Sequence, residues 1–337
     1  MASLLRAAVI GLGSMGANHA RVLADLPGID LVGVADSDPE RTAQATARRT
    51  FPGFNSVAGL LRATQPDLVT IAVPTRAHAA TALEAIAAGA HVLVEKPIAA
   101  TIGEAQGLAE AAARAGTMLS VGHIVRFDPA IQALRERLRA DQGGRVLQLR
   151  ARRVNPFPER IRDVGVIHDL ATHDIDIMRY LLGLDVRRVY AEAQRHVNTE
   201  FEDLLAGLLH FEEGVLGVLE INWLTPTKER LLEVLCERGM FVVDYEAQSL
   251  TFYENFAATA REGAIASVTE GPMTRYPVAH QEPLRAELAA FRDAVRDGGP
   301  PPVSPADAIA ALTVAEALAQ SANTGEPVSV AEIVAPA

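Results

Sequence analysis

The strongest constraint on the fold is a regular alternation in the first 123 residues. Short runs rich in β-branched and aliphatic residues alternate there with alanine-rich stretches that suit helices. This alternation indicates βαβ units, which place a parallel sheet between two layers of helices. We therefore expect an α/β fold with a doubly wound parallel sheet and strands at residues 5–10, 29–36, 67–73, 91–95 and 117–123.

Three glycines, Gly11, Gly13 and Gly16, follow the first expected strand and precede a helical stretch. Such a turn lets bare backbone N–H groups and a helix N-terminus approach a phosphate, although a tight surface turn would use glycine as well. Asp36 ends the second expected strand, 20 residues after Gly16. A carboxylate at that point accepts hydrogen bonds from the adenosine ribose and repels a 2′-phosphate. The pattern predicts a Rossmann domain that binds NAD rather than NADP.

Two other interpretations of the segment around Asp36 stay open. Arg41 lies close to Asp36 in the sequence and is a cation that could hold the extra phosphate of NADP. Asp36 could also do no more than begin a turn and cap the helix that follows.

The pattern of the sequence changes after residue 123. Long strand-like runs follow one another, separated by turns such as Glu-Glu-Gly and Glu-Arg-Gly, and this suggests a mostly antiparallel sheet. We predict an NAD-binding domain over residues 1–123 and an α+β domain for substrate binding and oligomerisation over residues 124–337, whose terminal helix can pack back on the first domain. A sheet with such apolar strands needs a cover on its second face, so we expect a homodimer or homotetramer. Helices are expected near residues 129–139, 166–182, 282–297 and 306–322.

Composition argues against several classes of protein. The chain has 42 acidic and 31 basic residues, for a net charge of −11, which disfavours binding to nucleic acid. No apolar run is long enough to span a membrane and the first residues lack the pattern of a cleavable signal, so we expect a cytoplasmic protein. The single cysteine, Cys236, lies in an apolar run and excludes a disulfide framework. The nine histidines form no metal-ligand motif, so no metal is expected.

Two short segments carry candidate catalytic groups. Lys96 follows Glu95 at the carboxyl end of an expected parallel strand, the edge at which doubly wound sheets bind ligands. Asp169, His173 and Asp176 are spaced by four and three residues, so they share one side of an expected helix. A carboxylate beside an imidazole suits acid–base catalysis, although a solvated helix face would also explain the spacing. Asp174 falls on the apolar side of the helix and needs a hydrogen-bond partner if it is buried.

Several motifs in this order resemble those of the glucose-fructose oxidoreductase and inositol dehydrogenase (Gfo/Idh/MocA) family: GLGSMG with Asp36, AVPTRAHA, EKP, VGHIVRFDP and DLATHDID. The resemblance implies that Lys96, Asp169 and His173 line the substrate site and that the Lys96–Pro97 bond is cis. It implies that His173 takes the hydroxyl proton, Lys96 holds the oxygen and Asp169 positions both. Cofactor contacts are implied for Gly11, Gly13, Ser14, Met15, Gly16, Asp36, Val73, Pro74, Thr75, His78, Glu95, Lys96 and His123, the last standing where many relatives carry Asn.

Within the family, the chain is most similar to a branch of UDP-N-acetylglucosamine 3-dehydrogenases, which implies oxidation of that nucleotide sugar at C3. Its diphosphate would need cations, although solvated surface residues would look the same. The available cations are Arg152, Arg153, Arg160, Arg162, Lys228 and Arg230. Three alternatives stay open: an inositol or free-sugar dehydrogenase, a glycosidase that recycles the hydride on NAD, and a non-enzymatic regulator that binds NAD and sugar. The candidate substrate contacts are Arg126, Arg153, Arg160, Arg162 and Asp176.

Overall fold

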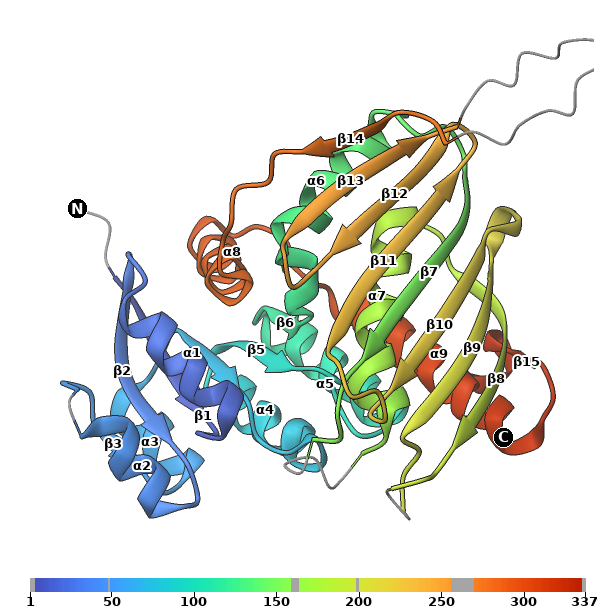
Figure 1. The fold of residues 1–337 in the computed structure, drawn as a ribbon. Coiled ribbons are helices and arrows are strands. Elements are labelled where there is room, and N and C mark those ends of the chain that lie inside the picture. Colours follow the sequence, from blue (N-terminus) through green and yellow to red (C-terminus); the bar gives the residue numbers. More distant parts are fainter. Residues whose placement is uncertain (1–3, 48, 159–163, 198–199, 256–269, 335–337) are drawn as a thin grey trace, which may run out of the picture. The chain divides into compact units, whose positions relative to one another are not determined.

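The computed structural model describes residues 4–47, 49–158, 164–197, 200–255 and 270–334, and the chain divides into two compact units (Figure 1). Unit 1 consists of Met1–Ile124 and Glu282–Leu312, and unit 2 consists of Val125–Gln281 and Thr313–Ala337. Each unit has its own sheet.

Unit 1 is built on a parallel sheet whose described strands follow the order β3-β2-β1-β4-β5-β6. The order reverses between β1 and β4, and doubly wound sheets bind their ligands at this point, outside the carboxyl ends of the strands. The central strands are buried on both faces, as a parallel sheet between helices requires. The strands are β1 (Leu5–Ile10), β2 (Ile29–Ala35), β3 (Gly53–Phe54), β4 (Leu68–Ile71), β5 (His91–Glu95) and β6 (Leu119–Gly122).

The helices of unit 1 follow the expected alternation, with one addition. The addition, α2 (Pro39–Thr46), has a single buried residue, Thr42, so its sequence carries almost no apolar periodicity. Asp38 caps it by accepting a hydrogen bond from the backbone of Glu40, and Pro39 occupies the first turn. The others are α1 (Ser14–Ala24), α3 (Val57–Thr64), α4 (His78–Ala87), α5 (Ile102–Ala115) and α8 (Pro283–Asp297).

Helix α8 comes from far along the chain and completes the core of unit 1. Its apolar residues Leu284, Leu288 and Phe291 are buried in one cluster with Leu23 of α1 and Leu31 of β2. The next helix, α9 (Pro305–Thr324), contributes to both units, since unit 1 ends at Leu312.

Unit 2 is built on a sheet with the described strand order β14-β13-β12-β11-β7-β10-β9-β8-β15. Neighbouring strands are antiparallel except β7 and β10, which run parallel, so the sheet is mostly antiparallel as the sequence predicts. The strands are β7 (Val146–Val154), β8 (Val186–Gln194), β9 (Leu204–Phe211), β10 (Leu216–Asn222), β11 (Glu229–Cys236), β12 (Gly239–Asp244), β13 (Ser249–Glu254), β14 (Met273–Tyr276) and β15 (Val328–Ser329).

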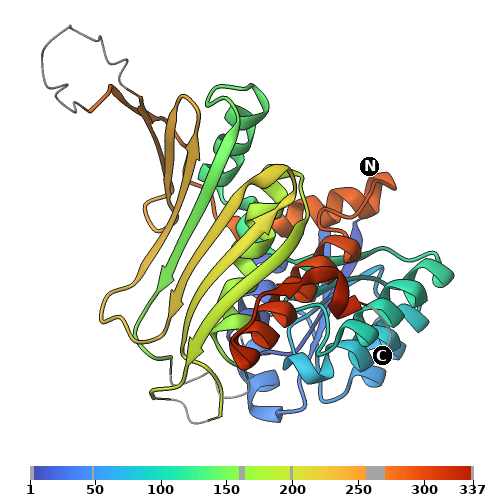
Figure 2. The ribbon, with the colours of Figure 1, turned by 90° about the vertical axis from the view of Figure 1, so that its right-hand side faces the viewer.

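The two faces of this sheet differ. Helices α6 (Pro129–Arg139) and α7 (Thr172–Leu182) lie on one face (Figures 1 and 2), where side chains such as Leu149 and Phe241 are buried. Side chains on the other face remain accessible. Alternating inward apolar and outward polar residues along each strand produce this division.

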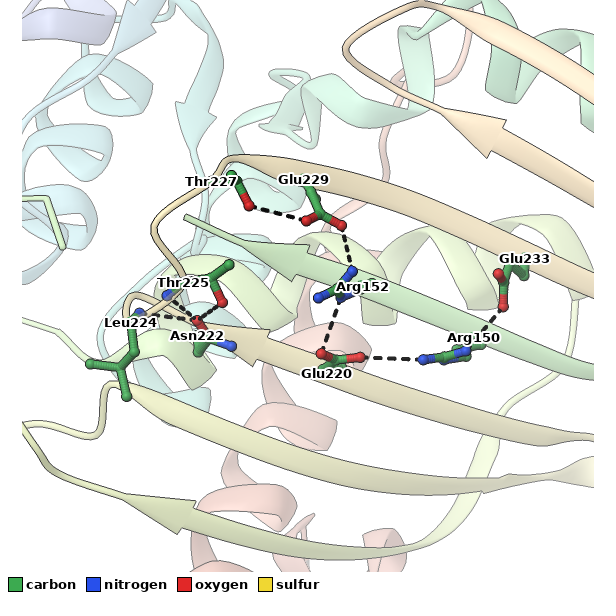
Figure 3. A network of polar contacts seen from close by, with 9 residues as sticks. All are labelled: Arg150, Arg152, Glu220, Asn222, Leu224, Thr225, Thr227, Glu229 and Glu233. Carbon is green, nitrogen blue, oxygen red and sulfur yellow. Dashed lines mark hydrogen bonds and ion pairs between the residues drawn. The ribbon is translucent and has the colours of Figure 1, made fainter. Parts of the chain in front are cut away.

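The accessible face, here called the open face, carries both charges and large apolar groups. Arg150 and Arg152 on β7 form ion pairs with Glu220 on β10, and Arg150 also pairs with Glu233 on β11 (Figure 3). Cross-strand register places exposed apolar residues on the same face: Leu208, Leu216, Leu235, Tyr253 and Met273.

Candidate functional site

The glycine turn between β1 and α1 has the geometry of a phosphate-binding loop. Gly11 has φ +85°, and a Cβ there would lie 2.6 Å from the carbonyl oxygen of Ala72. A Cβ on Gly16 would lie 1.7 Å from the carbonyl oxygen of Gly11, so the strand and the helix approach too closely for a side chain. These two glycines are therefore required by the turn itself.

Gly13 is different, because a Cβ there would meet nothing described nearer than Arg41 Nη1 at 4.0 Å. Gly13 is the N-cap of α1, and within the described chain no side chain caps this helix start, which Ser14 and Met15 form. The first N–H groups of α1 thus remain available to a phosphate at the positive end of the helix dipole. Open space beside a bare, uncapped helix N-terminus fits the pyrophosphate of a dinucleotide.

Asp36 follows β2 and is tied to the same turn. Its Oδ2 accepts a hydrogen bond from the backbone N–H of Leu12 at 2.6 Å, and its Oδ1 accepts one from Asp38 at 2.9 Å. Asp38, not Asp36, caps α2. Arg41 Nη1 lies 3.9 Å from Asp36 Oδ2. The carboxylate oxygens keep spare lone pairs for ribose hydroxyls, and the Rossmann context supports a ligand-facing role over simple helix capping.

Lys96 follows β5, and the Lys96–Pro97 bond is cis, as the resemblance implies. Its backbone N–H lies 3.2 Å from Glu95 Oε2, and Glu95 Oε1 lies 3.0 Å from His19 Nε2 of α1. Burial raises the pKa of the Glu95 carboxyl, but the hydrogen bond and charge of His19, with the charges of Lys96 and His78, outweigh it and lower the pKa. Glu95 therefore supports the lysine turn from within the core.

Two further cofactor candidates are deeply buried. His78, at the start of α4, is 1% exposed, and its ring nitrogens lie 2.8 Å from the Pro97 carbonyl and 2.9 Å from the Val73 carbonyl. Burial lowers the pKa of His78, while the two carbonyls and Glu95 oppose that effect. His123 directly follows β6 and is 2% exposed. The remaining candidates, Pro74 and Thr75, lie in the segment between β4 and α4.

In unit 2, the candidate catalytic residues lie on one helical segment that begins with a π-helical turn, Ile167–Ala171, and continues as α7. Such a turn carries an extra residue relative to an α-helix and often marks a functional site. Asp169 lies in the π-turn and His173 in the first turn of α7, and both are half-buried. The segment otherwise buries its apolar residues, among them Ile175, Ile177 and Met178.

Two buried arginines fix this helix. The guanidinium of Arg153 on β7 donates two hydrogen bonds to Asp174, from Nε at 2.7 Å and from Nη2 at 2.9 Å. Arg126 forms the equivalent fork with Asp176, its Nε lying 2.8 Å from Oδ2. All four side chains are at least 94% buried. The partner that Asp174 was expected to need is Arg153.

Asp176 therefore differs from Asp169 and His173, although the spacing predicts that all three share one side of the helix. It is fully buried against Arg126, whereas Asp169 and His173 reach the surface in part. Arg126 and Arg153 each donate two hydrogen bonds to a carboxylate of α7, which suits a role in holding the helix.

Arg230 of β11 is a further candidate cation whose pKa responds to Asp174 and Asp169. Burial lowers its pKa, as does Arg153, while Glu246, Asp174 and Asp169 raise it. Its contact with Glu246 is long, 3.6 Å, and Lys228 forms a 2.8 Å ion pair with the same carboxylate. Arg152 lies on the open face. Arg160 and Arg162 lie outside the described residues.

Other groups in the sequence have structural explanations. Cys236 is buried and burial raises the pKa of its thiol to about 11, which does not suit a nucleophile. Among the residues that the structure describes, no group of His, Cys, Asp and Glu could hold a metal ion. No helix in the described ranges is both long and apolar enough to cross a bilayer.

His19 is the residue that sequence reasoning missed. It lies on α1 just beyond the glycine motif and is fully buried against Glu95. Its only signal in the sequence is its place on the inward side of α1, three residues after Gly16, among Ala20, Val22 and Leu23. A buried histidine in that place needs a polar partner.

Comparison with known proteins identifies relatives of both units. Residues 5–123 match the oxidoreductase family with an NAD-binding Rossmann fold, and residues 131–242 match the GFO/IDH/MocA C-terminal domain. A UDP-N-acetylglucosamine 3-dehydrogenase of Acidithiobacillus ferrooxidans is 32% identical over 294 residues, which cover 86% of this chain and 88% of that protein. Inositol 2-dehydrogenase 2 of Saccharopolyspora erythraea is 31% identical over 334 residues, covering 96% and 95%.

Among solved structures, the UDP-N-acetylglucosamine 3-dehydrogenase of Acidithiobacillus ferrooxidans superposes with a TM-score of 0.85 at 29% identity. The match covers 99% of this chain and all of that one. The fold of both units is therefore shared with this relative along essentially the whole length.

Proposed function

The chain belongs to the Gfo/Idh/MocA family of NAD-binding oxidoreductases, and on that basis we propose that it oxidises a secondary hydroxyl of a nucleotide sugar, with UDP-N-acetylglucosamine oxidised at C3 as the reaction. The observation that carries the proposal is the half-buried Asp169–His173 step on a helix that buried arginines hold in place. A regulator that only binds ligands has no need of a proton acceptor held so firmly.

In the proposed reaction, the bound NAD supplies the hydride acceptor. His173 takes the proton of the reacting hydroxyl, Lys96 donates a hydrogen bond to the same oxygen, and Asp169 orients the imidazole and favours its protonated form. The glycine turn at Gly11, Gly13 and Gly16 holds the pyrophosphate, and Asp36 holds the adenosine ribose.

Two features support an anionic substrate. A relative that shares the fold over its whole length is a UDP-N-acetylglucosamine 3-dehydrogenase. Arg230 lies in the electrostatic environment of Asp169 and has only a long contact with its carboxylate partner, so a diphosphate could use its guanidinium. An inositol dehydrogenase is the second candidate, favoured by the similarity to the Saccharopolyspora enzyme over nearly the whole chain.

The direct test is an assay of the purified protein with NAD against UDP-N-acetylglucosamine, other nucleotide sugars, free sugars and inositols. We expect the largest rise in absorbance at about 340 nm, the band of the reduced nicotinamide, with UDP-N-acetylglucosamine. The Arg230→Gln variant should raise KM for the nucleotide sugar more than for an inositol, because it removes a charge that only the diphosphate uses.

The outcomes of the panel separate the alternatives. Turnover with inositols but not with nucleotide sugars would replace the substrate while retaining the dehydrogenase. Cleavage of a glycoside with no net NADH would indicate a recycled hydride. Binding of NAD and sugar with no reduction in either direction would indicate a regulator and overturn the proposal.

We also propose that a second copy of the chain covers the open face of the nine-stranded sheet. Leu208 and Leu216 are 53% and 45% exposed there, beside self-complementary rows of arginine and glutamate. Apolar side chains gathered on one sheet face are typical of an interface between subunits.

Sedimentation equilibrium tests this assembly. We expect the wild type to be a dimer or larger, and the Leu208→Glu/Leu216→Glu double variant to shift towards the 35.9 kDa monomer, because burying the added carboxylates in the proposed interface would cost their hydration. The control is Leu83→Glu on α4, which has a similar exposure of 43% in unit 1. A wild type that is monomeric at micromolar concentration would contradict the proposal.

A further inference from the structure

His78 is a buried polar residue to which the proposed reaction gives no proton to transfer. It is 1% exposed, at the start of α4, and it lies between two segments that follow neighbouring strands of the parallel sheet. Its Nδ1 lies 2.8 Å from the carbonyl oxygen of Pro97, and its Nε2 lies 2.9 Å from that of Val73. Both ring nitrogens are thus directed at backbone and not at a ligand.

Each carbonyl belongs to a segment with a proposed task. Pro97 comes directly after Lys96, at the end of β5. Val73 follows β4, and its backbone nitrogen lies 2.8 Å from the place that a Cβ on Gly11 would take, so this segment packs against the first glycine of the phosphate loop. The imidazole therefore joins the lysine turn to the wall of the cofactor loop.

The lysine turn is held from its other side as well. The Glu95 carboxylate accepts a hydrogen bond from the backbone N–H of Lys96 at 3.2 Å and is paired with His19 of α1. The backbone is thus held at the N–H of Lys96, by Glu95, and at the carbonyl of Pro97, by His78. Misplacement of a reacting group by about 1 Å can cost about a hundredfold in rate.

We infer that His78 is a positioning residue that holds the Lys96 turn through the Pro97 carbonyl and the cofactor loop through the Val73 carbonyl. The part of this inference that concerns Lys96 rests on the proposed function. The part that concerns the cofactor loop does not. The ring sets one separation between the two segments, because Nδ1 lies 2.8 Å from one carbonyl oxygen and Nε2 lies 2.9 Å from the other. A ring nitrogen that carries a proton donates to the carbonyl it faces, since carbonyl oxygens only accept.

Two amide variants separate the contacts. The side-chain nitrogen of asparagine can take the place of Nδ1, and that of glutamine can reach the place of Nε2. His78→Asn should keep the Pro97 contact, raise the Kd for NAD about tenfold and leave kcat within about twofold. His78→Gln should keep the Val73 contact, leave the Kd for NAD within about twofold and lower kcat about tenfold to a hundredfold.

The Kd for NAD is measured by calorimetry, kcat by the assay above, and folding by circular dichroism and thermal unfolding. The matched controls are His91→Asn and His91→Gln, since His91 begins β5 at the end away from Lys96 and its Nδ1 accepts a hydrogen bond from Met118. Neither control should change kcat or the Kd for NAD. The crossed pattern at His78 is what a merely structural role would not produce.

Equal changes in both quantities for both variants, or no change in either, would overturn the inference. If His78→Asn fails to fold, His78→Gln decides: lower kcat at unchanged Kd supports the inference, and parallel losses overturn it. If the wild type turns over no substrate of the panel, the proposed function fails separately. Calorimetry then decides the inference, supported by weaker NAD binding in His78→Asn alone and overturned by equal binding in both variants.

Discussion

Replacing His173 by alanine is expected to lower kcat by about 10²- to 10⁴-fold, the usual contribution of a general base, and to leave the Kd for NAD unchanged. The imidazole lies in unit 2, whereas the glycine turn and Asp36 lie in unit 1. Loss of the proposed proton acceptor is therefore expected to act on chemistry and not on cofactor binding. Steady-state kinetics with the substrate found by the panel, together with calorimetry for NAD, measure the two quantities.

The neighbouring His168 provides the matched control for this experiment. It is the same residue type on the same segment, but its Nε2 lies 3.0 Å from Glu316 of α9. His168→Ala should therefore leave kcat within about twofold. A His173→Ala variant that kept more than a tenth of wild-type kcat would show that another group accepts the proton.

The largest effect on stability is expected for Asp174→Ala. It leaves the Arg153 guanidinium, which is 3% exposed, without the carboxylate that now accepts two of its hydrogen bonds. Breaking a buried pair in this way costs about 3–5 kcal/mol, because a buried charge loses its compensation. Fluorescence of Trp223, the single tryptophan and 1% exposed in unit 2, reports the free energy of unfolding of this unit in urea.

Two further variants define the cause of this loss. Asp185→Ala removes a carboxylate, 67% exposed, from a surface pair with Arg179, and should cost less than about 1 kcal/mol. Replacing both members of the buried pair, as Arg153→Met/Asp174→Leu, should recover most of the stability, because neither member of this pair is then left as an uncompensated buried charge. A single Asp174→Ala variant as stable as Asp185→Ala would contradict the role given to this pair.

The main architecture follows from local patterns in the sequence. Alternating runs predict the parallel sheet of unit 1, because the spacing of apolar residues within each run distinguishes a strand from a helix. The glycine turn could be predicted too, since Gly11 and Gly16 stand where a side chain would collide with the backbone. The bounds of helix α2 could not be predicted from periodicity, because only Thr42 of its residues is buried and a helix with almost no apolar side lacks the periodic signal.

The candidate site divides in the same way. The spacing of Asp169 and His173 places them on one segment that reaches the surface in part. The same spacing assigns Asp176 to that side, yet it is fully buried. Asp176 is buried because Arg126, from another element, gives its carboxylate a partner inside the unit, and spacing along one helix cannot anticipate that partner.

The sequence by itself determined the alternation of the main strands and helices of unit 1, the glycine turn with Asp36, and the residue types available for catalysis, because these depend on neighbours along the chain. Only the tertiary structure decided which buried polar groups meet. Arg153 with Asp174, Arg126 with Asp176, Glu95 with His19 and the carbonyls around His78 are brought together by the packing of distant elements. A buried polar group must find a partner wherever the fold provides one, and local sequence says that a partner is needed but not which it will be.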